Sequence, residues 1–140
     1  MASINAGKVV MGTIAAGLVI NVVESVMNLF VIAGPMEDLL ASLGLPPMGG
    51  AAMGGFAVLA FMLGFLVTWT YAAIRPRYGA GPATALKAGF AVWAAFYFLG
   101  TGAYVLMGMF PLSLFLITLA YTLPMMLAAA YVGGMVYKEE

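Results

Sequence analysis

The sequence predicts an all-α integral membrane protein, built as a bundle of four transmembrane helices, and three observations lead to this prediction. Of the 140 residues, 65% are hydrophobic and only 7% are charged, whereas soluble domains carry about 25% charged residues. Long stretches without any ionisable residue separate the few charges. These stretches also lack the strict alternation of transmembrane β-strands. We therefore expect a single transmembrane domain over residues 1–140.

Four apolar stretches are each long enough to cross a bilayer, which requires about 20 mostly apolar residues. Glu24 is the one ionisable residue inside the first stretch, and Phe110-Pro111 divides the last charge-free run in two. Because that break is short, the third and fourth spans should form an antiparallel hairpin. The expected spans are residues 8–33, 50–74, 84–108 and 112–136.

The first external loop, residues 34–49, is expected to hold a short amphipathic helix. Pro35 suits its first position, and Glu37 and Asp38 would then lie in the first turn, where the helix dipole favours anions. Gly44 should end the helix. Its apolar face would consist of Met36, Leu39, Leu40 and Leu43. We expect this helix to lie on the outer membrane surface, and a plain structured connector is the alternative.

The basic residues predict the orientation of the chain. With four spans, the two termini and the second loop share one side, and all five basic residues fall there: Lys8, Arg75, Arg77, Lys87 and Lys138. Cytoplasmic loops carry an excess of Lys and Arg, so both termini should be cytoplasmic, in a bacterial cytoplasmic membrane. Four aromatic residues near this side should form an interfacial belt: Trp69, Tyr71, Tyr78 and Tyr137.

The composition excludes several classes of function. The chain contains no Cys and no His, which excludes disulfides, thiol catalysis and the usual zinc and iron–sulfur sites. Its formal net charge of zero leaves no electrostatic footprint for a nucleic-acid partner. One intramembrane Glu without a second carboxylate or a nucleophile does not make an active site. We therefore expect no enzymatic activity, no metal and no cofactor.

Glu24 belongs to a polar stripe on the first span. The stripe repeats at spacings of three and four, which places its members on one helical face: Thr13, Gly17, Asn21, Glu24 and Asn28. An uncovered charge within the bilayer costs at least a few kcal/mol. Glu24 should therefore face protein or water, about 5 Å beyond the bilayer midplane at 1.5 Å per residue.

Residues at the same depth on other spans are the expected partners of Glu24. The predicted buried polar cluster consists of Glu24, Asn21, Asn28, Thr101, Tyr104, Tyr121 and Thr122, with Tyr97 and Thr118 as further candidates. Tyr97, Thr101 and Tyr104 would share one face of the third span. The cluster has three interpretations: hydrogen bonding between helices, a proton or cation site, or a contact to a ligand or pigment.

Small residues form further faces on the second and third spans, where they permit close approach of helices. The residues on these faces are Gly50, Gly54, Ala57, Phe61, Gly64, Thr68 and Tyr71 on the second span, and Gly89, Trp93, Gly100, Tyr104 and Gly108 on the third. Their contacts could lie within the bundle or against a second subunit.

Two segments carry a resemblance to known proteins. They are Lys87-Ala88-Gly89-Phe90 followed by Trp93, and residues 111–117, Pro-Leu-Ser-Leu-Phe-Leu-Ile. On these residues the chain resembles small uncharacterised bacterial four-helix membrane proteins grouped as a domain of unknown function. The resemblance covers nearly the whole chain and implies no activity. The glutamate in the first of four spans is also similar to that of the small multidrug resistance exporters. This chain differs from them in its greater length, its long first loop and its Glu beyond the midplane.

Two functions are consistent with these features. In the first, the chain is a non-catalytic component of a membrane assembly, either an accessory subunit or a self-associating protein. In the second, it is a small homo-oligomeric transporter or channel that uses Glu24 as a proton or cation site, because four spans are few for a monomeric path. The expected partners are membrane lipids and either further copies of the chain or a larger complex. Whether a lipid, quinone or pigment binds between the helices stays open.

Overall fold

The computed structural model describes residues 3–138, and every regular element in that range is a helix. Four helical stretches are long and apolar enough to cross a membrane, which confirms the predicted fold class. They are α1 (Ala6–Phe30), α3 (Gly50–Tyr78), the stretch Pro82–Leu106 and α6 (Leu112–Val136). The predicted spans differ from these helices by four residues at most. Residues 1–2 and 139–140 of the predicted domain lie outside the described residues.

The third span is composite. It begins as α4 (Pro82–Trp93), continues as the π-helix η1 (Ala94–Thr101) and ends as α5 (Gly102–Leu106). A backbone reversal at Gly108, where φ is +73°, stops it. There the Met109 N–H donates to the Tyr104 carbonyl oxygen at 2.9 Å, a typical helix-ending bond. The sequence predicted one continuous α-helix here, so η1 is a departure from the prediction.

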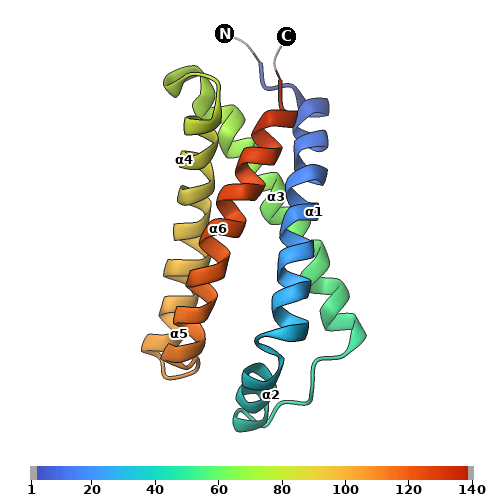
Figure 1. The fold of residues 1–140 in the computed structure, drawn as a ribbon, viewed down its shortest axis with the longest axis vertical. Coiled ribbons are helices and arrows are strands. Elements are labelled where there is room, and N and C mark those ends of the chain that lie inside the picture. The colour runs from blue at the N-terminus through green and yellow to red at the C-terminus, as the bar shows by residue number, and fades with distance from the viewer. Residues whose placement is uncertain (1–2, 139–140) are drawn as a thin grey trace.

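The four spans run alternately up and down, and both ends of the chain lie at the same end of the bundle (Figure 1). The turn between α3 and α4 lies there too, and with it all five basic residues of the chain. We call this the basic end and the opposite one the α2 end. Helix α1 packs on α3 and α6, whereas α4 packs on α6 and α3. Toward the α2 end, α1 and α3 diverge from η1, α5 and α6 (Figure 1).

The loop helix is present as α2 (Ala33–Ser42), and it begins two residues before the predicted start at Pro35. Glu37 and Asp38 therefore fall in its second turn, so their predicted place in the first turn was wrong. Gly44, with φ of +69°, ends the helix as predicted. The Leu45 N–H closes that end on the Leu40 carbonyl oxygen at 2.9 Å.

Glycines allow the helix backbones to touch at the centre of the bundle. A Cβ added to Gly64 of α3 would lie 2.7 Å from the Gly17 nitrogen and 2.8 Å from the Thr13 carbonyl oxygen, both on α1. A Cβ on Gly89 of α4 would lie 2.9 Å from the Met126 carbonyl oxygen on α6. These two glycines of the predicted small-residue faces therefore serve packing within the bundle. Gly54, in contrast, has open space where its Cβ would be.

Two tyrosines close the basic end. Tyr71 and Tyr137 are 3% and 1% exposed, so they do not belong to a lipid-facing belt as predicted. Their hydroxyls accept hydrogen bonds from loop amides, Tyr137 from the Asn5 N–H at 3.2 Å and Tyr71 from the Gly81 N–H at 3.1 Å. This demand from backbone donors turns both rings inward. Trp69 and Tyr78 remain exposed.

The glycine contacts predict a sharp difference between two positions of α3. Gly64→Ala should lower the free energy of unfolding by about 1–3 kcal/mol, because its methyl group meets backbone atoms that cannot rotate away. The measurement is reversible unfolding in mixed micelles. Gly55→Ala is the matched control, because nothing lies within 4 Å of its Cβ position. It should leave stability unchanged or raise it slightly. Equal stabilities of the two variants would contradict the close α1–α3 contact.

Candidate functional site

The carboxylate of Glu24 accepts three hydrogen bonds from three elements of the bundle. The Tyr97 hydroxyl of η1 donates to Oε1 at 2.9 Å, and the Tyr121 hydroxyl of α6 donates to Oε2 at 2.9 Å. The Asn28 Nδ2 of α1 donates to Oε2 at 3.0 Å. Hydrogen bonds to an ionised acceptor are roughly twice as strong as neutral ones. We call Glu24, Asn28, Tyr97 and Tyr121 the Glu24 cluster.

Asn28 fixes the carboxylate from within α1. It lies four residues after Glu24, which places the two side chains one above the other on the helix. Its Nδ2 also donates to the Glu24 carbonyl oxygen, at 2.8 Å. The same amide therefore contacts both the backbone and the side chain of Glu24, which restricts the position of the carboxylate on α1.

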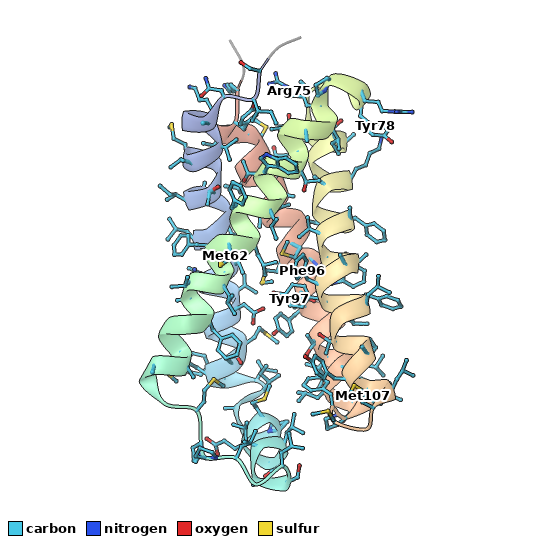
Figure 2. All side chains as sticks on the ribbon, turned by 180° about the vertical axis from the view of Figure 1, so that it is seen from behind. Met62, Arg75, Tyr78, Phe96, Tyr97 and Met107 are labelled. Atoms are coloured by element: carbon cyan, nitrogen blue, oxygen red, sulfur yellow. The ribbon has the colours of Figure 1, made fainter. Side chains whose placement is uncertain are left out.

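The π-helix η1 positions Tyr97. The side of the third span that faces the bundle carries residues at intervals of four, buried at Gly89 and Trp93 and half-buried at Tyr97, Thr101 and Val105. In an α-helix, residues at intervals of four rotate around the helix axis by about 40° per interval, because four residues exceed one turn of 3.6 residues. The wider turn of a π-helix makes four residues fall short of one turn, so the direction of this rotation reverses. The π segment therefore keeps Tyr97 directed at α1, and Figure 2 shows Tyr97 between the two pairs of helices.

The same change of register removes Tyr104 from the site. On a continuous α-helix Tyr97, Thr101 and Tyr104 would share one face, as the sequence predicted. After η1, Tyr104 is 54% exposed and gives none of the three bonds to the Glu24 carboxylate, so its predicted place in the cluster was wrong. Thr101 stays on the bundle side and is half-buried. None of the three bonds to the Glu24 carboxylate comes from it.

Asn21 and Thr122 lie near the cluster but form other contacts. The Asn21 Nδ2 donates to the Gly17 carbonyl oxygen at 3.0 Å and to the Ala57 carbonyl oxygen at 3.3 Å, which ties α1 to α3. Thr122 is fully buried. Its Oγ1 donates to the Thr118 carbonyl oxygen at 2.6 Å and accepts from the Trp93 Nε1 at 3.0 Å. The predicted polar residues thus form separate contacts: Asn21 joins α1 to α3, Thr122 joins α6 to α4, and the Glu24 cluster joins α1 to both η1 and α6.

Sequence reasoning found part of this arrangement. Glu24, Asn28 and Tyr121 come together as predicted from depth and helical spacing. Tyr97 had been only a further candidate, and Trp93 had been placed in a packing face. The spacing of Gly89, Trp93, Tyr97 and Thr101 at strict intervals of four was the available signal, because an α-helix does not keep such residues on one face.

The chemistry available at the site is proton exchange and hydrogen bonding. The three groups that donate to Glu24 are two phenols and an amide, which are all uncharged. Among the described residues, no group of three or more His, Cys, Asp or Glu side chains could hold a metal ion. Glu24 is half-buried, and the site comprises one carboxyl group with two phenolic donors beside it.

Comparison with known proteins identifies no family for this chain. Comparison with protein-family models, with curated proteins and with solved structures gave no match. The resemblance of residues 87–93 and 111–117 to small four-helix membrane proteins therefore stays a prediction, and it carries no activity.

The geometry predicts that Tyr97 and Tyr121 each contribute to stability through Glu24. Tyr97→Phe and Tyr121→Phe should each lower the free energy of unfolding by about 0.6–3 kcal/mol, the range for membrane hydrogen bonds and for bonds to charged groups. The double variant should deviate from additivity, because both phenols share one acceptor. The measurement is unfolding in mixed micelles.

Tyr104→Phe is the matched control for these two variants. It removes the same hydroxyl from an exposed tyrosine that the cluster does not use, and stability should stay unchanged. A loss for Tyr104→Phe equal to that for Tyr97→Phe would contradict the assigned register of η1.

Proposed function

We propose that this chain is a non-catalytic integral membrane protein that acts within a membrane assembly, as an accessory subunit or by association with further copies of itself. One observation carries the proposal: both oxygens of Glu24, the one carboxyl group within the four spans, already accept hydrogen bonds from the chain's own side chains. Polar contacts between helices of this kind hold membrane bundles together. We therefore assign the Glu24 carboxylate a structural role, in which it holds the helices of the bundle together.

The outer surface of the bundle supports a role in assembly. It is covered by large apolar side chains on every span, such as Leu29, Phe56, Leu59, Phe90, Leu99 and Leu116. Gly50 and Gly54 lie four residues apart on α3, with nothing within 4 Å of their Cβ positions. Small residues on an exposed face allow another helix to approach closely. Contacts within the bilayer, made by helix faces, therefore suit this chain better than contacts made by loops.

The charge distribution supports an orientation with both termini in the cytoplasm of a bacterium. All five basic residues lie at the basic end, as expected of the cytoplasmic side. Helix α2 would then lie at the outer surface. Its Glu37 and Asp38 are exposed, and its Met36 and Leu39 are half-buried, which agrees with a helix that rests on the lipid headgroups.

Native mass after gentle extraction tests the assembly proposal. The protein is taken from its own membrane with a patch of surrounding lipid, and its mass is measured together with its partners. We expect either a complex of fixed stoichiometry or a defined homo-oligomer. A monomer at the concentration found in the membrane would contradict the proposal. Gly54→Leu should reduce self-association if α3 forms the contact, and Leu116→Ala on α6 is the control.

A second candidate function is a small homo-oligomeric transporter or channel in which Glu24 binds a proton or a cation. The specific observation that favours it is η1, because π-helical segments in helices are frequent at functional sites. Here the segment places a phenol on an intramembrane carboxylate at 2.9 Å. Intramembrane carboxylates are also frequent in proton relays. In this function Glu24 would exchange its tyrosine bonds for the transported ion.

Flux measurements in liposomes test the second candidate. Wild-type protein should carry pH-dependent flux of protons or small cations, and Glu24→Gln should abolish it because the amide cannot release a proton. Tyr104→Phe, which leaves the cluster intact, should transport like the wild type. Normal flux through Glu24→Gln, or no flux through the wild type, would end this candidate and leave the assembly proposal in place.

A further inference from the structure

The π-helical form of η1 is not explained by its local sequence. Residues 94–101 read Ala-Ala-Phe-Tyr-Phe-Leu-Gly-Thr, without a proline. Ala and Leu are good α-helix formers, and π-helices are rare and mostly limited to a single turn. A segment of eight residues in this form therefore needs support from outside itself. The bond from the Tyr97 hydroxyl to Glu24 on α1, at 2.9 Å, supplies it.

An α-helical form of the same segment would direct a different residue at α1. In a regular α-helix the bundle face of α4, which ends at Val92 and Trp93, continues with Phe96 and then with residues 99–100. In the structure Phe96 is 52% exposed, whereas Tyr97 is half-buried. The segment thus has two discrete registers, one with Tyr97 on the bundle side and one with Phe96 there. Only the register with Tyr97 on the bundle side allows the Tyr97 hydroxyl to donate a hydrogen bond to Glu24.

The surroundings of η1 allow this change. Helix α4 packs on both α3 and α6, whereas η1 and α5 pack mainly on α6 and η1 reaches α1 through the Tyr97–Glu24 bond. Leu99 and Leu106 are 64% and 91% exposed. Both figures show the two pairs of helices diverging on this side of the cluster. A turn of this part of the third span would exchange the ring contact of Phe98 with Phe115 on α6, whose centroids lie 6.3 Å apart.

The groups facing Glu24 decide what controls the change. They are Tyr97 from η1, Tyr121 from α6 and Asn28 from α1 itself. Helix α3 contributes no titratable group at this level, since the first one along it is Tyr71 near the basic end. The bonds from the three donors are charge-assisted when the carboxylate is ionised, whereas a protonated carboxyl is a neutral acceptor and turns one oxygen into a donor. Protonation of Glu24 is therefore the event that weakens the tyrosine bonds.

We propose that η1 is a conformational switch, held as a π-helix by ionised Glu24 and released to an α-helix when Glu24 is protonated. Release withdraws Tyr97 from α1, brings Phe96 toward it and turns α5, which changes the faces that the α2 end presents to the bilayer. The proposal goes beyond both proposed functions, since it describes the outer half of the bundle whichever assembly the chain joins.

Paired spin labels test the proposal in lipid nanodiscs. The chain has no Cys, so introduced pairs are labelled without ambiguity. Leu29→Cys with Leu106→Cys reports on the α2 end, where both positions are exposed. Met11→Cys with Phe90→Cys reports on the half nearer the basic end and is the reference pair. Distances are compared at neutral and acidic pH in the wild-type background and in Glu24→Gln, Tyr97→Phe and Tyr104→Phe.

The proposal expects one distance for the α2-end pair in the wild type at neutral pH. A second distance should appear at acidic pH, and at all pH values in Glu24→Gln and Tyr97→Phe. The reference pair and Tyr104→Phe should match the wild type at neutral pH. Identical α2-end distances in all variants at all pH values would overturn the proposal. So would a parallel change in the reference pair, which would indicate loosening of the whole bundle, or a second distance in Tyr104→Phe at neutral pH.

Discussion

A carboxylate inside a membrane span needs hydrogen-bond donors, because lipid supplies none, and this requirement shapes the middle of the bundle. Glu24 lies on α1, yet two of its donors come from the opposite pair of helices. The α1–α3 pair and the pair formed by the third span and α6 are therefore joined at the level of Glu24. Nearer the basic end the helices need no such connection, since glycines bring their backbones into direct contact.

The two modes of contact give the bundle an unequal distribution of rigidity. At the basic end, buried tyrosines and glycine contacts leave little freedom of movement. Toward the α2 end, the pairs diverge and one polar cluster connects them (Figure 1). Regions with few buried contacts are the first to open in proteins. The half of the bundle at the α2 end is therefore the part in which the loss of one polar cluster would change the contact between the two pairs of helices.

The fold could be predicted from sequence because it depends on properties of whole segments and not on single contacts. The long runs without charges indicate the four spans, and the five basic residues all fall at one end of the bundle. The site could be predicted only in part. Glu24, Asn28 and Tyr121 follow from spacing and depth, which a regular helix preserves. Tyr104 was assigned wrongly because the register of the third span changes at η1. At that change of register a hydrogen bond joins residues 73 positions apart, and local propensity carries no information about such a long-range contact. Tyr71 and Tyr137 are buried and do not join the expected aromatic belt for a similar reason. Their hydroxyls accept hydrogen bonds from backbone N–H groups outside their own helices.

The separation of Glu24 from its donors along the chain also bears on how the protein is made. Helix α1 is synthesised first, whereas Tyr97 and Tyr121 follow 73 and 97 residues later. At about 5–20 residues per second, Glu24 waits roughly 5 to 20 seconds for its second phenol. During that interval only Asn28 of the three donors is present, so the remaining hydrogen bonds of this carboxyl group must come from outside the chain. The Glu24 cluster is thus completed only when α6 is in place.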